Sequence, residues 1–174
     1  MKLYETTGGP NWTNNDGWLT EKPVGDWYGV DTKAGRVTNL QLNDNALDGP
    51  LPAELGNLSS LMWLELSNND LVGPIPPELG GLGNLEWLSI RHTRLTGQIP
   101  PELGDLTNLE GLNLDANELT GSLPAELGNL TNLRELRVWN NRLSGPIPLE
   151  FVNLPLTAFH WGDNDLCAPL DEAF

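Results

Sequence analysis

Residues 109–132 read LEGLNLDANELTGSLPAELGNLTN, and this pattern returns along the chain every 24 residues. Full rows begin at Val37, Leu61, Leu85, Leu109 and Leu133, and a partial sixth row begins at Leu156. Every full row carries Gly at its thirteenth position and Pro at its sixteenth, as in Gly121 and Pro124. A fixed period of this length indicates a repeat architecture, in which each row forms one coil that packs only against its neighbours.

Each row contains a Leu-x-Leu step that predicts a short strand. In Leu64-Glu65-Leu66, for example, apolar side chains alternate with a polar one, which places one face of the strand in the core. Because the chain returns to the same column in every row, successive strands are expected to pair in parallel, about 4.8 Å apart. We therefore predict a solenoid with a parallel sheet of about six strands, centred on Leu40, Leu64, Leu88, Leu112, Leu136 and Phe159.

The turn after each predicted strand carries a polar column at row position nine. Its members are Asn45, Asn69, Thr93, Asn117, Asn141 and Asn164. A short amide side chain at such a turn can hydrogen-bond buried backbone groups of its own coil and of the next, so we predict a stacked asparagine ladder. Beyond the turn, the recurring prolines predict a convex side of extended segments and short 3-10 turns.

The row from Leu61, LMWLELSNNDLVGPIPPELGGLGN, resembles the plant-type leucine-rich repeat family, and the resemblance covers residues 37–166. The WYGV stretch at residues 27–30 is similar to the N-terminal cap of that family. The plant version carries paired cysteines in this cap, whereas Asp31 follows here, so the chain is similar to the cysteine-free branch of bacterial and algal or protist proteins. The resemblance implies a right-handed solenoid of the α/β repeat class, mostly β and irregular, that recognises a protein or peptide and is secreted or cell-surface.

A solenoid must cover its open core at both ends. The chain divides into an N-terminal cap (1–36), five leucine-rich repeats (37–155), and a partial sixth repeat with a C-terminal cap (156–174). At the first end, Trp12, Trp18 and Trp27 lie outside every repeat column, so we expect them to form an apolar lid over the first coil. Residues 1–7 are expected to be the tail of a helix.

The other end predicts a second cap. Trp161 occupies a column where earlier rows place an apolar core residue, so we expect it to be buried. Cys167 is expected to be a free thiol packed in this cap as a small apolar group, and residues 171–174 to be the first turn of another helix. These partial helices lead us to interpret both ends as cut, and the resemblance implies that the natural protein continues past Phe174.

The composition argues against several classes of function. The 174 residues include 9 Lys and Arg against 24 Asp and Glu, and the formal net charge of −15 disfavours binding to nucleic acid or to anionic lipid. No stretch approaches the roughly 18 apolar residues that a membrane helix requires. With one cysteine and two histidines, the chain shows neither zinc-ligand spacing nor a convincing nucleophile–base pair. We therefore expect no membrane insertion, metal, cofactor or catalytic site.

Part of the acidic charge follows the repeat. One glutamate per row occupies position eighteen, on the predicted convex side: Glu54, Glu78, Glu102, Glu126 and Glu150. We interpret this column as a solvated stripe that opposes sideways association, which predicts a monomer.

Strand side chains at row positions three, five and seven point away from the core, onto one concave face. Three of them are the tryptophans Trp63, Trp87 and Trp139, and exposed tryptophan is rare on a surface without a binding task. The candidate partner-binding residues on this face are Trp63, Glu65, Trp87, Ser89, Arg91, Asn113, Asp115, Arg137, Trp139 and His160.

The same residues leave other hypotheses open beside protein or peptide binding. Trp63 and Trp87 are expected to stack on adjacent strands, and such a pair can serve only to stabilise the sheet. Stacked indoles with polar neighbours can also hold the rings of a glycan. Finally, the whole segment can be a structural spacer within a larger multidomain protein.

Overall fold

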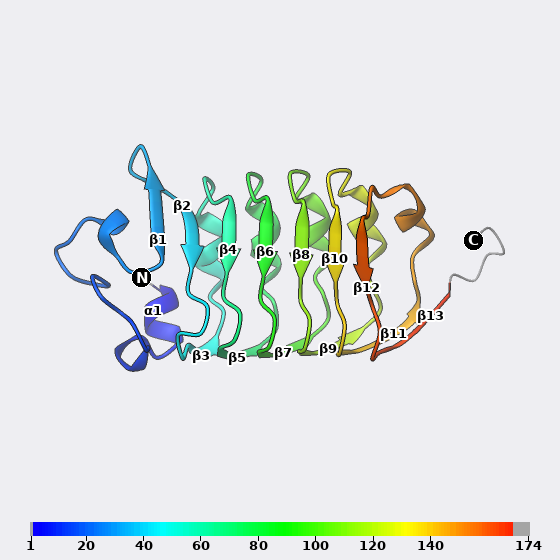
Figure 1. The fold of residues 1–174 in the computed structure, drawn as a ribbon, viewed down its shortest axis with the longest axis horizontal. Helices are drawn as coiled ribbons and strands as arrows, with labels where there is room; N and C mark the ends of the chain where they lie inside the picture. The colour runs from blue at the N-terminus through cyan, green and yellow to red at the C-terminus, as the bar shows by residue number, and fades with distance from the viewer. Residues whose placement is uncertain (1, 169–174) are drawn as a thin grey trace.

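The computed structural model describes residues 2–168, which coil into an elongated solenoid (Figure 1). Its concave side is a seven-stranded sheet in the order β1-β2-β4-β6-β8-β10-β12. The strands are β1 (Val30–Lys33), β2 (Arg36–Gln41), β4 (Trp63–Glu65), β6 (Trp87–Ser89), β8 (Gly111–Asn113), β10 (Glu135–Arg137) and β12 (Ala158–His160). β1 pairs antiparallel with β2, and every later pair is parallel, with Leu64 opposite Leu40 and Leu88. The predicted parallel sheet and its strand centres are confirmed.

A second sheet lies along one flank and was not predicted from the sequence. It contains six parallel strands in the order β13-β11-β9-β7-β5-β3, along the lower edge in Figure 1. They are β3 (Asp48–Pro50), β5 (Asp70–Gly73), β7 (Arg94–Gly97), β9 (Glu118–Gly121), β11 (Arg142–Pro146) and β13 (Asp165–Cys167). Five of these segments hold one leucine each in the core, whereas β3 holds none. None of them has a period-two pattern, so their pairing follows from the stacking of the coils.

The convex side consists of short 3-10 helices, as predicted. They are η3 (Ala53–Asn57), η4 (Pro77–Gly81), η5 (Pro101–Asp105), η6 (Ala125–Asn129) and η7 (Leu149–Asn153). Adjacent helices approach so closely that a Cβ on Gly80 would overlap the carbonyl oxygen of Glu102. The recurring glycine of this segment is therefore required by backbone contact, while the glutamates of the convex column are exposed.

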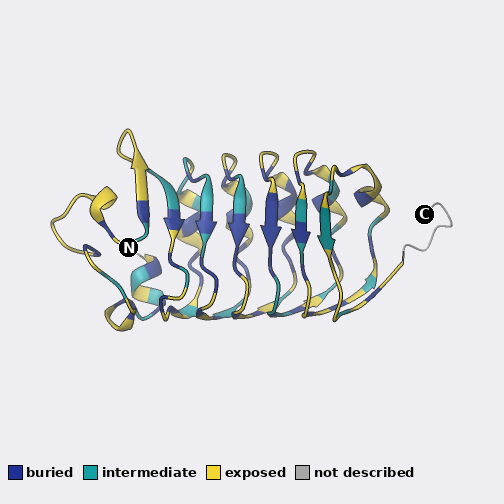
Figure 2. Ribbon diagram, in the orientation of Figure 1, coloured by how far each residue is buried: buried dark blue, intermediate teal, exposed yellow. Residues whose placement is uncertain are grey.

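The core is a continuous column of leucines between the two sheets and the convex helices (Figure 2). The asparagine ladder closes it on one side, as predicted. The Asn69 side chain accepts hydrogen bonds from the backbone N–H groups of Asn45 and Leu47, each at 3.0 Å, and donates to the carbonyl oxygen of Leu42 at 2.8 Å. Thr93, the exception in the column, donates its hydroxyl hydrogen to the side-chain oxygen of Asn117.

The residue before each ladder position has a left-handed backbone. Positive φ values of 51° to 57° occur at Asp44, Asn68, His92, Ala116, Asn140 and Asp163. Asn and Asp tolerate this conformation, whereas His and Ala adopt it at a cost. The turn after the strand is therefore imposed by the repeat, even where the local residue disfavours it.

The segment before the first repeat contains one short α-helix and two short 3-10 helices. Helix α1 (Lys2–Thr6) is followed by η1 (Gly9–Asn11) and η2 (Val24–Asp26). Trp12, Trp18 and Trp27 are buried, and the Trp12 and Trp18 rings meet edge to face with centroids 4.9 Å apart. Their apolar surfaces cover the open end of the first coil, which fulfils the expected role of a lid.

Two expectations for the C-terminal end are wrong. Trp161 is 38% exposed, whereas Val138, its equivalent one coil earlier, is fully buried. The reason is that, in the described part of the chain, no later coil packs against the Trp161 ring. Cys167 is a free thiol, but it is exposed rather than packed in a cap. The helical turn expected at 171–174 lies outside the described residues.

Candidate recognition surface on the concave sheet

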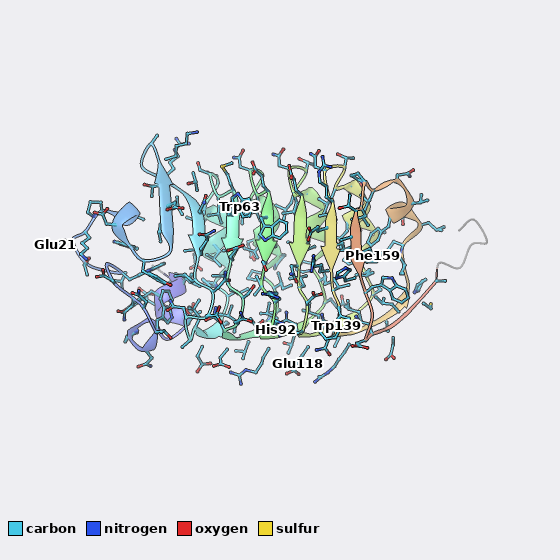
Figure 3. The ribbon with its side chains drawn as sticks, viewed as in Figure 1. Glu21, Trp63, His92, Glu118, Trp139 and Phe159 are labelled. Atoms are coloured by element: carbon cyan, nitrogen blue, oxygen red, sulfur yellow. The ribbon has the colours of Figure 1, made fainter. Side chains whose placement is uncertain are left out.

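The concave face carries two aromatic features, which lie toward opposite ends of its strands (Figure 3). Trp63 on β4 and Trp87 on β6 are register partners, and their rings stack with centroids 5.7 Å apart and an interplanar angle of 21°. The predicted stack is thus confirmed, although both indoles are half-buried. Trp139, two residues beyond the C-terminal end of β10, is 40% exposed. The face therefore offers apolar contacts on both sides of a polar centre.

A shallow polar hollow of about 310 Å³ occupies the centre of this face. Its floor contains Ser67 and Ser89, whose hydroxyl oxygens lie 2.9 Å apart, and the amide of Asn113. Ser89 and Asn113 were predicted as partner contacts, but they are only 6% and 8% exposed because they lie beneath longer neighbours. The hollow is lined by Asn43, Asp44, Glu65, Ser67, Asn68, Trp87, Ser89, Arg91, Asn113, Glu135 and Arg137.

Several residues that line the hollow were not among the partner-binding residues predicted from the sequence. The side chain of Asn43 donates to a carboxylate oxygen of Glu65 at 3.2 Å and accepts from the backbone N–H of Ser67 at 2.7 Å. Glu135 pairs with the Nε of Arg137 at 3.0 Å. These side chains occupy the predicted concave columns, so their position was readable, but nothing in the sequence distinguishes them from polar scaffolding.

The charged groups of the face fall into paired and unpaired sets. Among the described residues, Arg137 has a carboxylate partner and the exposed Arg91 has none within salt-bridge distance. Burial raises the pKa of Asp115, although the backbone N–H of Trp139, which donates to it at 2.7 Å, and the nearby Arg137, His160 and Arg91 act in the opposite direction. Arg91 is therefore the cation of this face that is most available to an incoming group.

Neither metal chemistry nor a membrane span is indicated in residues 2–168. No three His, Cys, Asp or Glu side chains there gather closely enough to hold an ion. Likewise, no helix among these residues has the length and apolar character to cross a bilayer. The concave face is built from aromatic, hydroxyl, amide and charged side chains.

Comparison with known proteins finds the same repeat and the same fold. A family model described as "Leucine-rich repeat region" matches residues 34–153. A chain of the BIR3–SERK2 complex from Arabidopsis thaliana is 34% identical, with a TM-score of 0.77 and coverage of 86% of this chain and 81% of that one. The BIR2 ectodomain from the same plant is 32% identical, with a TM-score of 0.85 and coverage of 95% and 90%.

A third similar structure is a complex with a named partner. It is the ectodomain of the plant membrane receptor kinase GASSHO1/SCHENGEN3 from Arabidopsis thaliana, bound to CASPARIAN STRIP INTEGRITY FACTOR 2. It is 32% identical, with a TM-score of 0.82, and the match covers 97% of this chain but 22% of that one. The chain described here thus corresponds to a portion of that longer ectodomain.

Proposed function

Since the chain belongs to the leucine-rich repeat family, we propose that it is a non-catalytic recognition module that binds a protein or peptide through its concave face. One observation carries this proposal: the sheet surface places the Trp63–Trp87 pair and the exposed Trp139 on either side of a polar hollow. Tryptophan and arginine dominate the energetics of protein interfaces, and a mixed apolar and polar surface of this kind fits a polypeptide segment.

The similar structures support the proposal. Two of the three are complexes, one of BIR3 with SERK2 and one of GASSHO1/SCHENGEN3 with CASPARIAN STRIP INTEGRITY FACTOR 2. Their plant-type repeat scaffold is therefore compatible with protein partners. Because the similar structures include receptor ectodomains, we also propose a secreted or cell-surface location. The one cysteine, Cys167, lies outside the N-terminal cap, so the absence of paired cysteines from the cap fits the cysteine-free branch of the family.

The geometry favours a polypeptide over a glycan as the partner. Sugar rings bind to the open face of an aromatic ring. The Trp87 ring is stacked with Trp63 and lies so close to Gly111 of the next strand that an added Cβ would overlap it, which leaves Trp87 half-buried. A structural spacer has no need of exposed aromatic side chains. The exposed Trp139 and Arg91, together with the half-buried Trp63–Trp87 pair, therefore also favour a binding role.

Selection from a phage-displayed library of random peptides on the immobilised chain tests the proposal. We expect the enriched peptides to lose binding to Trp63→Ala and Trp139→Ala variants and to keep binding to Glu102→Lys, a matched charge change on the convex side. Peptides that bind the tryptophan variants unchanged, or that need Glu102, would contradict the concave site. A glycan array probed with the same proteins covers the alternative, and glycan binding that depends on Trp63 would favour it.

A further inference from the structure

Gly111 lies beneath one of the aromatic anchors. It is the register partner of Trp87 on the neighbouring strand, and a Cβ on Gly111 would overlap atoms Cζ3 and Cε3 of the Trp87 ring. Its φ lies outside the left-handed region, so backbone conformation does not require glycine at this position. The absence of a side chain instead allows the indole of Trp87 to rest on the backbone of β8. Gly111 is buried as a result.

This contact sets the position of the whole aromatic pair. Trp87 lies between the bare backbone of Gly111 and the ring of Trp63, with which it stacks at 5.7 Å. Two neighbours, one on each side, restrict the rotamers available to the indole. The same ring forms one wall of the polar hollow, beside Ser89 and Asn113. The pose of one side chain therefore shapes both the apolar and the polar part of the surface.

The arrangement occurs twice on the concave face. Trp139 is followed in the same column of the next coil by Gly162, where an added Cβ would lie 3.3 Å from Cδ1 of the indole. At both places, a tryptophan on the recognition surface therefore leans over a glycine of the following coil. The contact is tight at Gly111 and looser at Gly162, which agrees with the half-buried state of Trp87 and the exposed state of Trp139.

We propose that Gly111 is a positioning residue of the recognition surface, which holds the Trp63–Trp87 pair as a preformed anchor for an apolar side chain of a polypeptide partner. The proposal rests on the proposed function. An anchor that is already ordered in the free protein loses little side-chain entropy on binding, so it contributes more to affinity than a mobile indole does. The polar hollow beside it then receives the polar groups that flank the apolar residue.

The pose can be measured without any partner. Closely packed indoles give an exciton couplet in far-ultraviolet circular dichroism, and the cap tryptophans Trp12, Trp18 and Trp27 contribute one as well. The couplet of the Trp63–Trp87 pair is therefore the part of the wild-type signal that Trp87→Ala removes, and we expect Gly111→Ala to abolish the same part. Gly83→Ala is the matched control, because an added Cβ there meets no atom within 4 Å, and it should keep the couplet. A couplet that survives Gly111→Ala overturns the proposal.

A double variant separates positioning from folding. Removing the Trp87 ring removes the atoms that a Cβ at residue 111 would strike, so Trp87→Ala/Gly111→Ala should have the same thermal midpoint as Trp87→Ala. A lower thermal midpoint in the double variant than in Trp87→Ala would show that the backbone itself needs glycine at residue 111. That result would overturn the proposal. This comparison holds even if Gly111→Ala alone folds poorly.

The binding assay uses a peptide enriched by the phage selection described above. We expect Trp87→Ala to weaken binding by about thirtyfold, Gly111→Ala by about tenfold, and the double variant by no more than Trp87→Ala alone. Equal losses from Gly111→Ala in the presence and absence of Trp87 would overturn the positioning role, as would unchanged affinity after loss of the couplet. If selection yields only peptides whose binding is unchanged by loss of the Trp63 or Trp87 ring, the proposed function fails too. The two contrary results named before this one refute only the role of Gly111.

Discussion

Replacing Asn117 by Ala should lower the free energy of unfolding by about 3–5 kcal/mol, because the ladder side chain holds several buried groups at once. Its oxygen accepts from the backbone N–H of Leu95 at 3.1 Å and from the hydroxyl of Thr93. Its amide donates to the carbonyl oxygens of Ile90, at 2.7 Å, and of Leu114, at 3.2 Å. Asn117 itself is buried, so water cannot simply replace these bonds.

The magnitude follows from which groups lose their partner. The Leu114 carbonyl oxygen keeps a second donor, the amide of Asn141 at 2.9 Å. The Leu95 N–H and the Ile90 carbonyl oxygen lose their hydrogen bonds to the side-chain amide of Asn117. Each such loss in a buried site costs about 1–3 kcal/mol. The Thr93 hydroxyl loses its acceptor but is free to rotate, so it adds less.

Asn108→Ala is the matched control from the preceding turn of the same array. Asn108 also donates to the coil before it, at 2.7 Å from the Gly83 carbonyl oxygen, but it is exposed, so water can take over and the loss should stay below about 1 kcal/mol. Urea unfolding followed by circular dichroism measures both variants, and an unchanged m-value checks that the array still unfolds as a unit. A loss of less than about 1 kcal/mol for Asn117→Ala, or equal losses for both, would refute the ladder account.

Three further predictions test other parts of the structure. Ala116→Asn should raise the free energy of unfolding by about 0.5–1 kcal/mol, because φ at Ala116 is +53°, a conformation that Asn tolerates better; a lower urea midpoint would contradict this. Because burial raises the pKa of Asp115 in the folded state, the contribution of Asp115 to stability should fall as pH rises from 3.8 through the folded pKa. The thermal midpoint of Asp115→Asn relative to wild type should therefore rise across the same interval, and a constant difference would refute this. Cys167 should react with a thiol reagent about as fast in the native protein as in urea, whereas slow native labelling would show that it is covered.

The period of the sequence predicts most of the fold, because each column has one environment in every coil. The core leucines, the parallel sheet, the 3-10 convex side and the asparagine ladder all follow from it. The second sheet does not, since its segments, such as residues 70–73, carry no alternation of their own. Trp161 shows the limit of the column argument, because a core-facing position is buried only where another coil covers it.

The candidate site was predictable only in outline. The concave columns fix which side chains share a face, so the stack of Trp63 on Trp87 could be foreseen. Burial within that face could not, because it depends on which long side chains lie over short ones, as at Ser89. The left-handed turn is signalled by Asn68 but hidden at Ala116, where the repeat imposes a conformation that the residue itself disfavours.

The central claim is that a polypeptide binds the concave face, and the indole N–H signals of the tryptophans test it within one NMR titration. When a phage-selected peptide is added to the isotope-labelled protein, we predict that the signals of Trp63, Trp87 and Trp139 shift together as the peptide binds. The buried cap residues Trp12, Trp18 and Trp27 serve as internal controls and should not move. Shifts confined to the cap tryptophans, or saturable binding without any shift of the three concave indoles, would contradict the account.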